Sequence, residues 1–205
     1  MAISGLVITY NEEKNIGKCI DALFEVCDEV IIVDSLSADN TVKIAEEKGA
    51  KVISQKFLGD GPQRTHGLPF CKNDWILNLD ADEFLDKDAK EFILKEKYLE
   101  GNYDAFSFRV KNFLADELID FSGWYPDHKV RFFNKKTAKP SEAKVHQKIE
   151  TTNEKKVAVH ILHYGWESFE QIIAKKNQYS TWHALQLFDQ GKRVGAMKPV
   201  INGLT

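Results

Sequence analysis

The chain has 205 residues and a formal net charge of −3 at pH 7. Hydrophobic residues make up 43% of it and charged residues 29%, which are ordinary globular values and argue against extensive disorder. The small negative charge gives no general reason to bind nucleic acid, because a polyanion requires a basic face. The length fits one domain with a sizeable core, with or without an appendage.

Three cysteines, Cys19, Cys27 and Cys71, lack metal-ligand spacing, so we interpret them as reduced thiols of a cytoplasmic protein. The N-terminus has no basic segment ahead of its apolar residues, which predicts a strand and not a signal peptide. No apolar run approaches the ~20 residues that a membrane-spanning helix needs. We therefore expect a protein that is soluble or peripherally attached to a membrane.

The first half of the chain alternates apolar strands with helices. The clearest helix follows Lys14, where the apolar residues Ile16, Cys19, Ile20 and Leu23 recur at helical spacing. Four strands separated by three helices predict a parallel α/β sheet with right-handed crossovers. The predicted strands cover residues 6–8, 30–33, 51–54 and 74–79, and the other two helices cover residues 41–48 and 61–70.

The pattern changes after a predicted helix at residues 86–98. Residues 103–113 alternate apolar with polar side chains, which is typical of a strand with one wetter face. We interpret this region as a mixed or antiparallel extension that ends in a helix at residues 168–190. Its further predicted strands cover residues 117–121, 130–133, 145–150 and 157–163.

Three carboxylates, Asp80, Asp82 and Glu83, lie within four residues after the predicted strand 74–79. Carboxylates this close raise one another's pKa, so a site that keeps them ionised usually holds a cation. Hard oxygen ligands suit Mg²⁺ or Mn²⁺, which also bind the oxygens of a substrate phosphate. The alternative is a solvated acidic turn that starts the helix after Asp86.

Polar segments follow three of the predicted strands directly, at residues 9–12, 34–35 and 80–83. Ligands of open parallel sheets bind at the carboxyl ends of the strands. We therefore expect these three segments to converge on one crevice. The combination predicts a divalent ion that holds a diphosphate.

A set of ordered motifs extends over nearly the whole chain. They lie at residues 6–16, 33–41, 57–64, 79–83, 123–127, 130–133, 145–146 and 163–180. In these motifs the chain resembles the family 2 glycosyltransferases of the GT-A fold, and most of all the small bacterial lipopolysaccharide core β-1,4-glucosyltransferases. The resemblance implies a GT-A (Rossmann-like) α/β fold with a mixed central sheet flanked by helices, a C-terminal antiparallel extension and a terminal helix.

The same resemblance implies an inverting transfer from a nucleotide sugar, assisted by Mg²⁺ or Mn²⁺. Residues 1–98 would form the half that binds the nucleotide sugar. Residues 99–205 would supply the acceptor-side strands and the C-terminal helix of one compact domain. The donor would be a UDP-hexose, with UDP-glucose as the first choice, and the acceptor a lipid-linked or other glycan such as the lipopolysaccharide inner core.

The resemblance assigns donor binding to residues after the first two strands and at the start of the third helix. Asp34 matches the residue that accepts the uracil ring N–H, and Gln63 and Arg64 would face the diphosphate or ribose from a helix N-terminus. Asp34 could instead cap a turn, although Asp39 is the better cap, and Arg64 could be a surface residue. The donor-binding set is Thr9, Tyr10, Asn11, Glu12, Asp34, Ser35, Gln63, Arg64 and Asp80.

The resemblance also assigns metal ligands. Asp82 would bind the metal directly, and Asp80 would reach the ribose or a metal-bound water. Other GT-A enzymes often complete the metal shell with a late histidine, which makes His163 the candidate third ligand and His160 a poorer one. His163 could instead be merely hydrogen-bonded.

The catalytic base is the part of the site for which the sequence offers several candidates. The family pattern places a carboxylate after the histidine of a Val-His motif, whereas this chain has His146-Gln147. Glutamine cannot accept a proton at any useful pH. Candidate bases are Asp127, then His146, then Glu142. A native glutamine with the base elsewhere and a Glu→Gln replacement both remain open.

Two other functions are compatible with the same motifs. A nucleotide-sugar-binding protein with impaired turnover would fit Gln147, and a related peptide or protein glycosyltransferase would share the motifs. A nucleotidyltransferase is disfavoured because residues 9–15 contain no glycine. The basic, aromatic C-terminal region is by default a core stripe with a solvated face, or else a peripheral contact with the inner face of the bacterial inner membrane.

Overall fold

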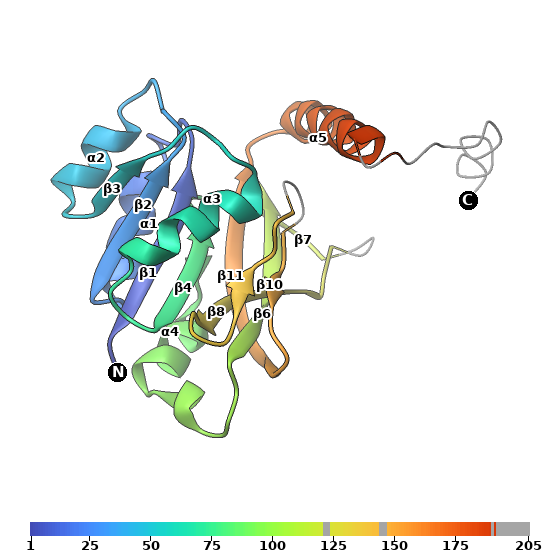
Figure 1. Cartoon of the computed structure of the whole chain (residues 1–205). Helices are drawn as coiled ribbons and strands as arrows, with labels where there is room; N and C mark the ends of the chain where they lie inside the picture. The colour runs from blue at the N-terminus through green and yellow to red at the C-terminus, as the bar shows by residue number, and fades with distance from the viewer. Residues whose placement is uncertain (121–123, 144–146, 190, 192–205) are drawn as a thin grey trace. The chain divides into compact units, whose positions relative to one another are not determined.

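The computed structural model describes residues 1–120, 124–143, 147–189 and 191 (Figure 1). The chain consists of two compact units, Met1–Glu167 and Ser168–Thr205. The first unit holds the sheet and the second begins with one long helix.

The sheet of the first unit is mixed, which confirms the predicted fold class. Its order is β3-β2-β1-β4-β8-β6-β11-β5, with β7 paired to β6. The four strands from β3 to β4 are parallel, β8 is antiparallel to both of its neighbours, and β11 is parallel to β6. The strands are β1 (Ile3–Thr9), β2 (Glu29–Asp34), β3 (Lys51–Ser54), β4 (Trp75–Asp80), β5 (Glu83–Leu85), β6 (Ala105–Leu114), β7 (Glu117–Ile119), β8 (Asp127–Asn134) and β11 (Glu154–Trp166). A separate pair joins β9 (Lys139–Pro140) to β10 (Ile149–Glu150).

Helices connect the parallel strands as predicted. The buried residues of α1 are the four apolar residues whose spacing predicted it. Helix α3 lies close to the sheet because Gly67 has no side chain: a Cβ there would come within 2.6 Å of Leu6 and 2.7 Å of Val33. The helices are α1 (Ile16–Phe24), α2 (Thr41–Glu47), α3 (Asp60–Gly67) and α4 (Lys87–Leu94), with 3-10 turns at Leu68–Phe70 and Lys97–Leu99.

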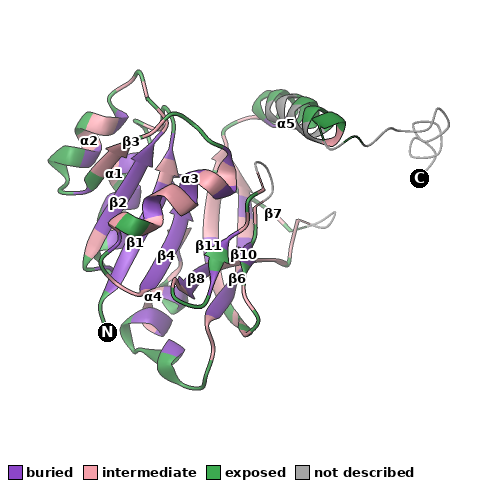
Figure 2. Ribbon diagram, in the orientation of Figure 1, coloured by how far each residue is buried: buried purple, intermediate pink, exposed green. Residues whose placement is uncertain are grey.

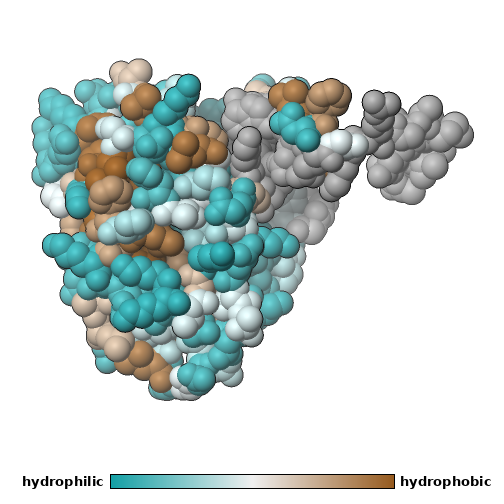
Figure 3. All heavy atoms as spheres, viewed as in Figure 1, coloured by the Kyte–Doolittle hydropathy of each residue, from teal (hydrophilic) through white to brown (hydrophobic). Residues whose placement is uncertain are grey.

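The core lies on both faces of the central strands, which Figure 2 shows as the most buried part of this unit. One side is rich in aromatic rings: Trp75 stacks on Phe132 and meets Tyr98 edge to face, each at 4.9 Å between ring centroids. Burying one such side chain contributes about 1.5–3 kcal/mol. In Figure 3 hydrophilic side chains cover most of the visible face of this unit, and apolar ones gather on the β2 and β3 side.

All three cysteines are free and buried. Burial raises the pKa of each thiol, that of Cys71 to about 12 and those of Cys19 and Cys27 still further. Because the thiolate is the reactive form, these three thiols should react only slowly at neutral pH.

Helix boundaries differ from the predicted ones where the backbone turns left-handed. The predicted helix 86–98 ends at Leu94, and Glu96 then takes a φ of 51°. The short strand β5 was not predicted, because three residues after an acidic turn carry no recognisable period. Of the predicted strand 145–150, only Ile149–Glu150 is a strand among the described residues.

The second unit contains the predicted terminal helix, α5 (Phe169–Asp189). Ser168 Oγ accepts a hydrogen bond from the Gln171 backbone N–H at 3.4 Å, at the predicted capping position. Within the described part of the chain, no helix combines the length and apolar character required to span a membrane. Figure 2 shows much of α5 as exposed. Its exposed residues include the apolar Phe169, Ile173, Leu185 and Phe188.

Candidate active site

Three polar residues lie side by side at the carboxyl ends of neighbouring parallel strands. Thr9 pairs with Asp34 in the β1–β2 register, and Ile8 pairs with Asp80 in the β1–β4 register. The structure therefore brings together the segments that the sequence analysis expected to converge. This edge is where ligands of open parallel sheets bind.

Hydrogen bonds from backbone N–H groups to side-chain oxygens tie the loop after β1 to the loop after β2 and to the start of α2. The Asn11 N–H donates to Ser37 Oγ at 2.8 Å, and the Ala38 N–H donates to Asn11 Oδ1 at 2.8 Å. The Glu12 N–H donates to Thr41 Oγ1 at 2.8 Å. Tyr10 is 60% exposed, so its ring is free to pack against a nucleotide base.

Asp34 is almost fully buried and shapes its own turn. Its carboxylate accepts hydrogen bonds from the Ser37 N–H at 2.9 Å and from the Ser37 hydroxyl. The capping role that was considered as an alternative is therefore present. A carboxylate has about four lone-pair sites, which leaves capacity for one more donor such as a uracil N–H. The neighbouring Thr9 Oγ1 is buried and has no hydrogen-bond partner among the described residues.

Gln63 and Arg64 are buried inside the protein, so the surface alternative for Arg64 is wrong. Gln63 Nε2 donates to Ser35 Oγ at 3.2 Å and to the Gln55 carbonyl at 3.0 Å. The N-terminus of α3 lies against a neighbouring segment, because a Cβ on Gly61 would be 1.8 Å from the Ser141 carbonyl oxygen. These two residues brace the strand ends instead of facing outward from that helix terminus.

Two buried arginines hold Asp80 in place. Arg64 donates to Asp80 and to Asn78 Oδ1, and Arg131 donates to Asp80 Oδ2 at 2.8 Å. Burial opposes ionisation of Asp80, but Arg131 and Arg64 outweigh it and hold the pKa of that carboxyl well below its usual range. Asp80 is therefore anionic at every working pH.

Glu83 completes the support of the acidic turn. It is fully buried, accepts from Arg131, and accepts from the Asp80 backbone N–H at 3.1 Å. The sequence analysis counted Glu83 among possible cation ligands and missed Arg131. The available signal was a single charge inside the apolar run of residues 130–133.

Asp82 and His163 meet because β5 pairs with β11. The register sets Glu83 opposite His163, and the Tyr164 N–H donates to the Asp82 carbonyl at 3.0 Å. Asp82 Oδ2 lies 3.4 Å from His163 Nε2. These two predicted metal ligands are thus adjacent, although they are far apart in the sequence.

A chain of hydrogen bonds orients His163. Its Nδ1 lies 2.8 Å from Asn112 Oδ1, and Asn112 Nδ2 donates to the Trp124 carbonyl at 3.2 Å. The second bond fixes the amide so that Oδ1 accepts the His163 Nδ1–H, which leaves Nε2, the nitrogen that faces Asp82, as the one that could bind a metal. The sequence analysis missed Asn112, which looked like an ordinary polar member of an alternating strand.

The pair fits a divalent ion. Two neighbouring ligands of an octahedral ion at about 2.1 Å lie roughly 3 Å apart, close to the observed separation. Gly165 leaves space beside them, since a Cβ there would come within 2.6 Å of His163 Nε2 and 3.3 Å of Asp82 Oδ2. The described residues contain no third histidine, cysteine or carboxylate grouped with them. Water and substrate phosphate oxygens would complete the shell.

The carboxylates of both loops raise the pKa of one buried group, the thiol of Cys19 in α1. Burial is the largest cause of the raised pKa, and the negative charges of four carboxylates raise it further: Asp82, Glu83, Asp80 and Glu12. Glu12 from the first loop therefore lies in the same electrostatic neighbourhood as the acidic turn.

Strand β8 brings a further cation and a candidate base to this neighbourhood. The charge of Lys129 acts on both Asp80 and His163, and among the described residues Lys129 makes no ion pair. Asp127 lies two residues earlier, opposite Val110 of β6. Gln147 Oε1 is buried without a hydrogen-bond partner among the described residues, and His146 lies outside them.

His160 is not available as a metal ligand, because both ring nitrogens are engaged. Nδ1 lies 3.0 Å from Asp86 Oδ2, and Nε2 lies 3.2 Å from the Tyr125 hydroxyl. Aromatic rings lie beside His163 instead: Trp166 is 5.0 Å from it and 4.9 Å from Trp124, between ring centroids. Flat, partly polar surfaces of this kind suit a sugar ring.

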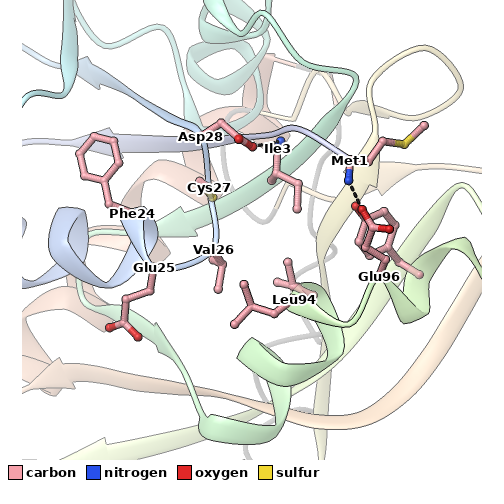
Figure 4. A pocket seen from close by; sticks show the side chains of 11 residues that line it. Met1, Ile3, Phe24, Glu25, Val26, Cys27, Asp28, Leu94 and Glu96 are labelled. Atoms are coloured by element: carbon pink, nitrogen blue, oxygen red, sulfur yellow. Dashed lines mark hydrogen bonds and ion pairs between the residues drawn. The ribbon is translucent and has the colours of Figure 1, made fainter.

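A hollow of about 330 Å³ lies at the opposite ends of the strands (Figure 4). Figure 4 shows Met1 bound there to Glu96 through its amino group, and Asp28 accepting from the Ile3 N–H. The hollow is far from the acidic turn and at the end of the sheet where ligands of this fold class do not bind. Its lining consists of Met1, Ile3, Phe24, Glu25, Val26, Cys27, Asp28, Ile93, Leu94, Glu96 and Tyr98.

Comparison with known proteins agrees with this arrangement. A glycosyltransferase of Rickettsia felis, described as uncharacterized, is 35% identical over 94% of this chain and 72% of its own length. The lipopolysaccharide core biosynthesis glycosyltransferase LpsC of Rhizobium meliloti is 30% identical over 94% of this chain and 74% of its own length.

Solved structures share the fold. TarS of S. aureus, residues 1–349, superposes with a TM-score of 0.55 at 18% identity, over 80% of this chain and 60% of that one. Its complex with UDP-GlcNAc gives the same TM-score. The family model described as glycosyl transferase family 2 matches residues 4–148. By this match and by its relatives, the chain belongs to glycosyl transferase family 2.

Proposed function

We propose that this glycosyltransferase moves a hexose, with glucose from UDP-glucose as the first choice, to a lipopolysaccharide inner-core or similar glycan acceptor, with inversion and with the help of Mg²⁺ or Mn²⁺. The observation that carries the proposal is the pairing of Asp82 with His163 beside the aligned strand ends of Asp34 and Asp80. The name of the LpsC relative supports the acceptor class. A protein of the same fold binds UDP-GlcNAc, which makes a UDP-sugar the donor to test first.

Each residue group has a distinct task in this proposal. Thr9, Tyr10 and Asp34 would hold the uracil base, and Asp80 would orient the ribose. Asp82 and His163 would hold the divalent ion, which supplies charge neutralisation to the leaving diphosphate. Lys129 would add a second positive charge on the same side. Residues 1–98 would thus form the donor half and residues 99–205 the acceptor side.

The proton acceptor in this proposal is Asp127. It precedes Lys129 on β8, which places a carboxylate near the cations that face the donor. Gln147 keeps a second function open, a nucleotide-sugar-binding protein without turnover. A related peptide or protein glycosyltransferase would differ only in its acceptor.

The experiment is a thermal-shift panel followed by a hydrolysis assay. UDP-glucose, UDP-GlcNAc and GDP-mannose are compared with and without Mn²⁺. A ligand at about 100 times its Kd adds about 2.7 kcal/mol of stability, which raises the Tm of a chain this long by roughly 5–10 °C. Stabilisation by a UDP-sugar together with slow hydrolysis supports the transferase. Stabilisation without hydrolysis or transfer supports the binding protein, and neither effect with any donor refutes both.

A peripheral membrane contact through the C-terminal unit is part of the proposal. It is supported by the exposed apolar side chains of α5, of which Phe188 is 78% exposed. Sedimentation with anionic and with neutral vesicles tests it. We expect the protein to bind the anionic vesicles and this binding to weaken with salt. If the protein sediments with neither kind of vesicle, the membrane contact is contradicted.

A further inference from the structure

Three basic residues form a row across neighbouring strands of the sheet. The β6–β11 register sets Arg109 opposite His160, and the β6–β8 register sets Arg109 opposite His128. Adjacent strands are about 4.8 Å apart, so the three side chains start within reach of one another on one face.

Two members of this row, Arg109 and His128, have a buried polar atom without a partner among the described residues. Arg109 Nε and His128 Nδ1 are buried without a hydrogen bond among the described residues. Ser107 Oγ, on the same face of β6 two residues earlier, is also buried without a partner, and Ser107 is only 1% exposed. Buried polar groups are nearly always satisfied, and leaving one unsatisfied costs about 1–3 kcal/mol. Several such donors at one place indicate a ligand that accepts hydrogen bonds.

The charge of the row points to an anion. Among the described residues, no carboxylate forms an ion pair with Arg109. The carboxylate bound to the row is Asp86, and it is engaged with His160 Nδ1 at 3.0 Å. A partly buried guanidinium with no counter-ion is costly, and its planar fork matches phosphate or carboxylate oxygens.

The row is separate from the metal site. His160 and His163 are three residues apart on β11, as are Arg109 and Asn112 on β6, and both stretches are regular. Residues an odd number apart on a strand point to opposite faces, and three residues span about 10 Å. An anion in the row would therefore be distinct from the diphosphate that the proposed function assigns to the side of Asp82 and His163.

Aromatic side chains border the row on the acceptor side. The Tyr125 hydroxyl bonds to His160 Nε2, and the two rings lie nearly parallel with centroids 6.2 Å apart. Trp124, the preceding residue, packs against Trp166. The Arg109 guanidinium beside such rings suits an anionic sugar better than a free inorganic ion.

We propose that Arg109 and His128, with Ser107 and His160 beside them, form a subsite for an oxyanion group, a phosphate or carboxylate, carried by the glycan acceptor. Anion binding follows from the row itself. The assignment to the acceptor rests on the proposed glycosyltransferase function.

The first test measures anion binding without any sugar. Inorganic phosphate is titrated into the metal-free protein, and the imidazole signals of His128 and His160, assigned with H128Q and H160Q, are followed by NMR. We expect saturable shifts in the wild type that weaken by about tenfold in R109M. The control K43M removes an exposed charge from α2, outside the row, and should change nothing. Equal shifts in R109M and wild type, or no saturable shift, overturn the subsite.

R109M is expected to fold, because it replaces a cation that has no described counter-ion with an apolar chain of similar length. If R109M does not fold, R109K is the second variant. R109K keeps the positive charge and loses the planar guanidinium, so its phosphate affinity should lie below that of the wild type and above that of R109M. Acetate titrated in the same way shows whether a carboxylate also fits the subsite.

The second test concerns the acceptor. A lipopolysaccharide core oligosaccharide and its dephosphorylated form are compared in transfer, beside hydrolysis of UDP-glucose alone. We expect a KM about tenfold lower for the phosphorylated form with wild-type protein, no such difference with R109M, and unchanged hydrolysis. A difference that survives in R109M overturns the acceptor assignment. Absence of all transfer and hydrolysis is a failure of the proposed function, and the phosphate titration still decides the subsite.

Discussion

Two regions of the sheet differ in how their charged groups are paired. At the strand ends of the donor side, Asp80 forms ion pairs with Arg64 and Arg131. On β6, Arg109 forms no ion pair among the described residues, and its Nε lacks a described partner. Both regions also hold neutral buried atoms without a described partner, such as Thr9 Oγ1 and Ser107 Oγ, so the difference lies in charge. It teaches that the donor side is neutralised before any substrate binds, whereas the proposed subsite would gain its counter-ion from a ligand.

The largest expected effect comes from breaking the donor-side network at Arg131. Arg131→Met leaves Asp80 with one arginine and the buried Glu83 without a cation, which should cost about 3–5 kcal/mol of stability. Denaturant unfolding measures the loss. Lys136→Met breaks only the exposed pair with Asp74 and should cost at most about 1 kcal/mol. Equal costs for the two variants contradict a preorganised network.

The second effect is on activity and not on stability. Asp82→Asn removes a charged metal ligand, so transfer should fall by about 10²- to 10³-fold. The metal-free Tm should change little, because the Arg131–Glu83 support remains. Steady-state kinetics over a range of Mn²⁺ concentrations, beside thermal unfolding with a chelator, separates the two. Full activity in Asp82→Asn rules out the assigned ligand.

The third effect is the pH dependence of metal binding. Burial lowers the pKa of His163, but Asp82 outweighs it and raises that pKa above its ordinary value of 6.5. Metal binding must displace the proton, so Mn²⁺ affinity should rise up to about tenfold per pH unit until pH exceeds the raised pKa, and then level off. Calorimetry measures it, and His163→Gln should remove this rise. A flat profile in the wild type contradicts ligation by His163.

The same pair affects the stability of the metal-free protein with the opposite sign. A histidine whose pKa is raised by folding stabilises most below its unfolded pKa. That contribution is lost as pH rises through the folded-state pKa of His163. Unfolding experiments in chelator should therefore show this loss in the wild type and not in His163→Gln.

The smallest expected effect sharpens the comparison at the donor loops. Leu36 has a φ of 66° and is 57% exposed, so its backbone is strained and its side chain is weakly packed. Leu36→Asn should raise stability by about 1 kcal/mol, because asparagine tolerates this conformation. Asn11, with a φ of 54°, is the matched position, and Asn11→Ala should lower stability because its Oδ1 accepts from the Ala38 N–H. Thermal unfolding measures both, and a loss of stability in Leu36→Asn contradicts the strain.

The parallel half of the fold was predictable because its signals are local. Apolar runs marked β1, β2 and β4, and parallel strands must bring their carboxyl ends to one edge, so the approach of Thr9 to Asp34 followed from the pattern. The support of the site was not predictable in this way. Glu83 and Arg131 meet through strand pairings that join distant parts of the chain. No periodic pattern in the sequence reveals which strands pair in this way.

The histidines show the same limit. His163 and His160 look alike in the sequence, as polar residues near the end of one strand. Pairing with β5 sets His163 beside Asp82, and the cap of α4 sets Asp86 against His160. The sequence ranked His163 above His160, and the register explains why His163 is the one that lies beside Asp82.

The three buried thiols have a practical consequence. Because burial raises the pKa of Cys19, Cys27 and Cys71, maleimide reagents should leave the native protein almost unlabelled at neutral pH. A single cysteine introduced at the exposed position of Leu36 would then carry a fluorophore without first removing the natural ones. Such a dye would lie near the proposed uracil site and report nucleotide binding by a change in its emission. The three buried cysteines would stay unlabelled.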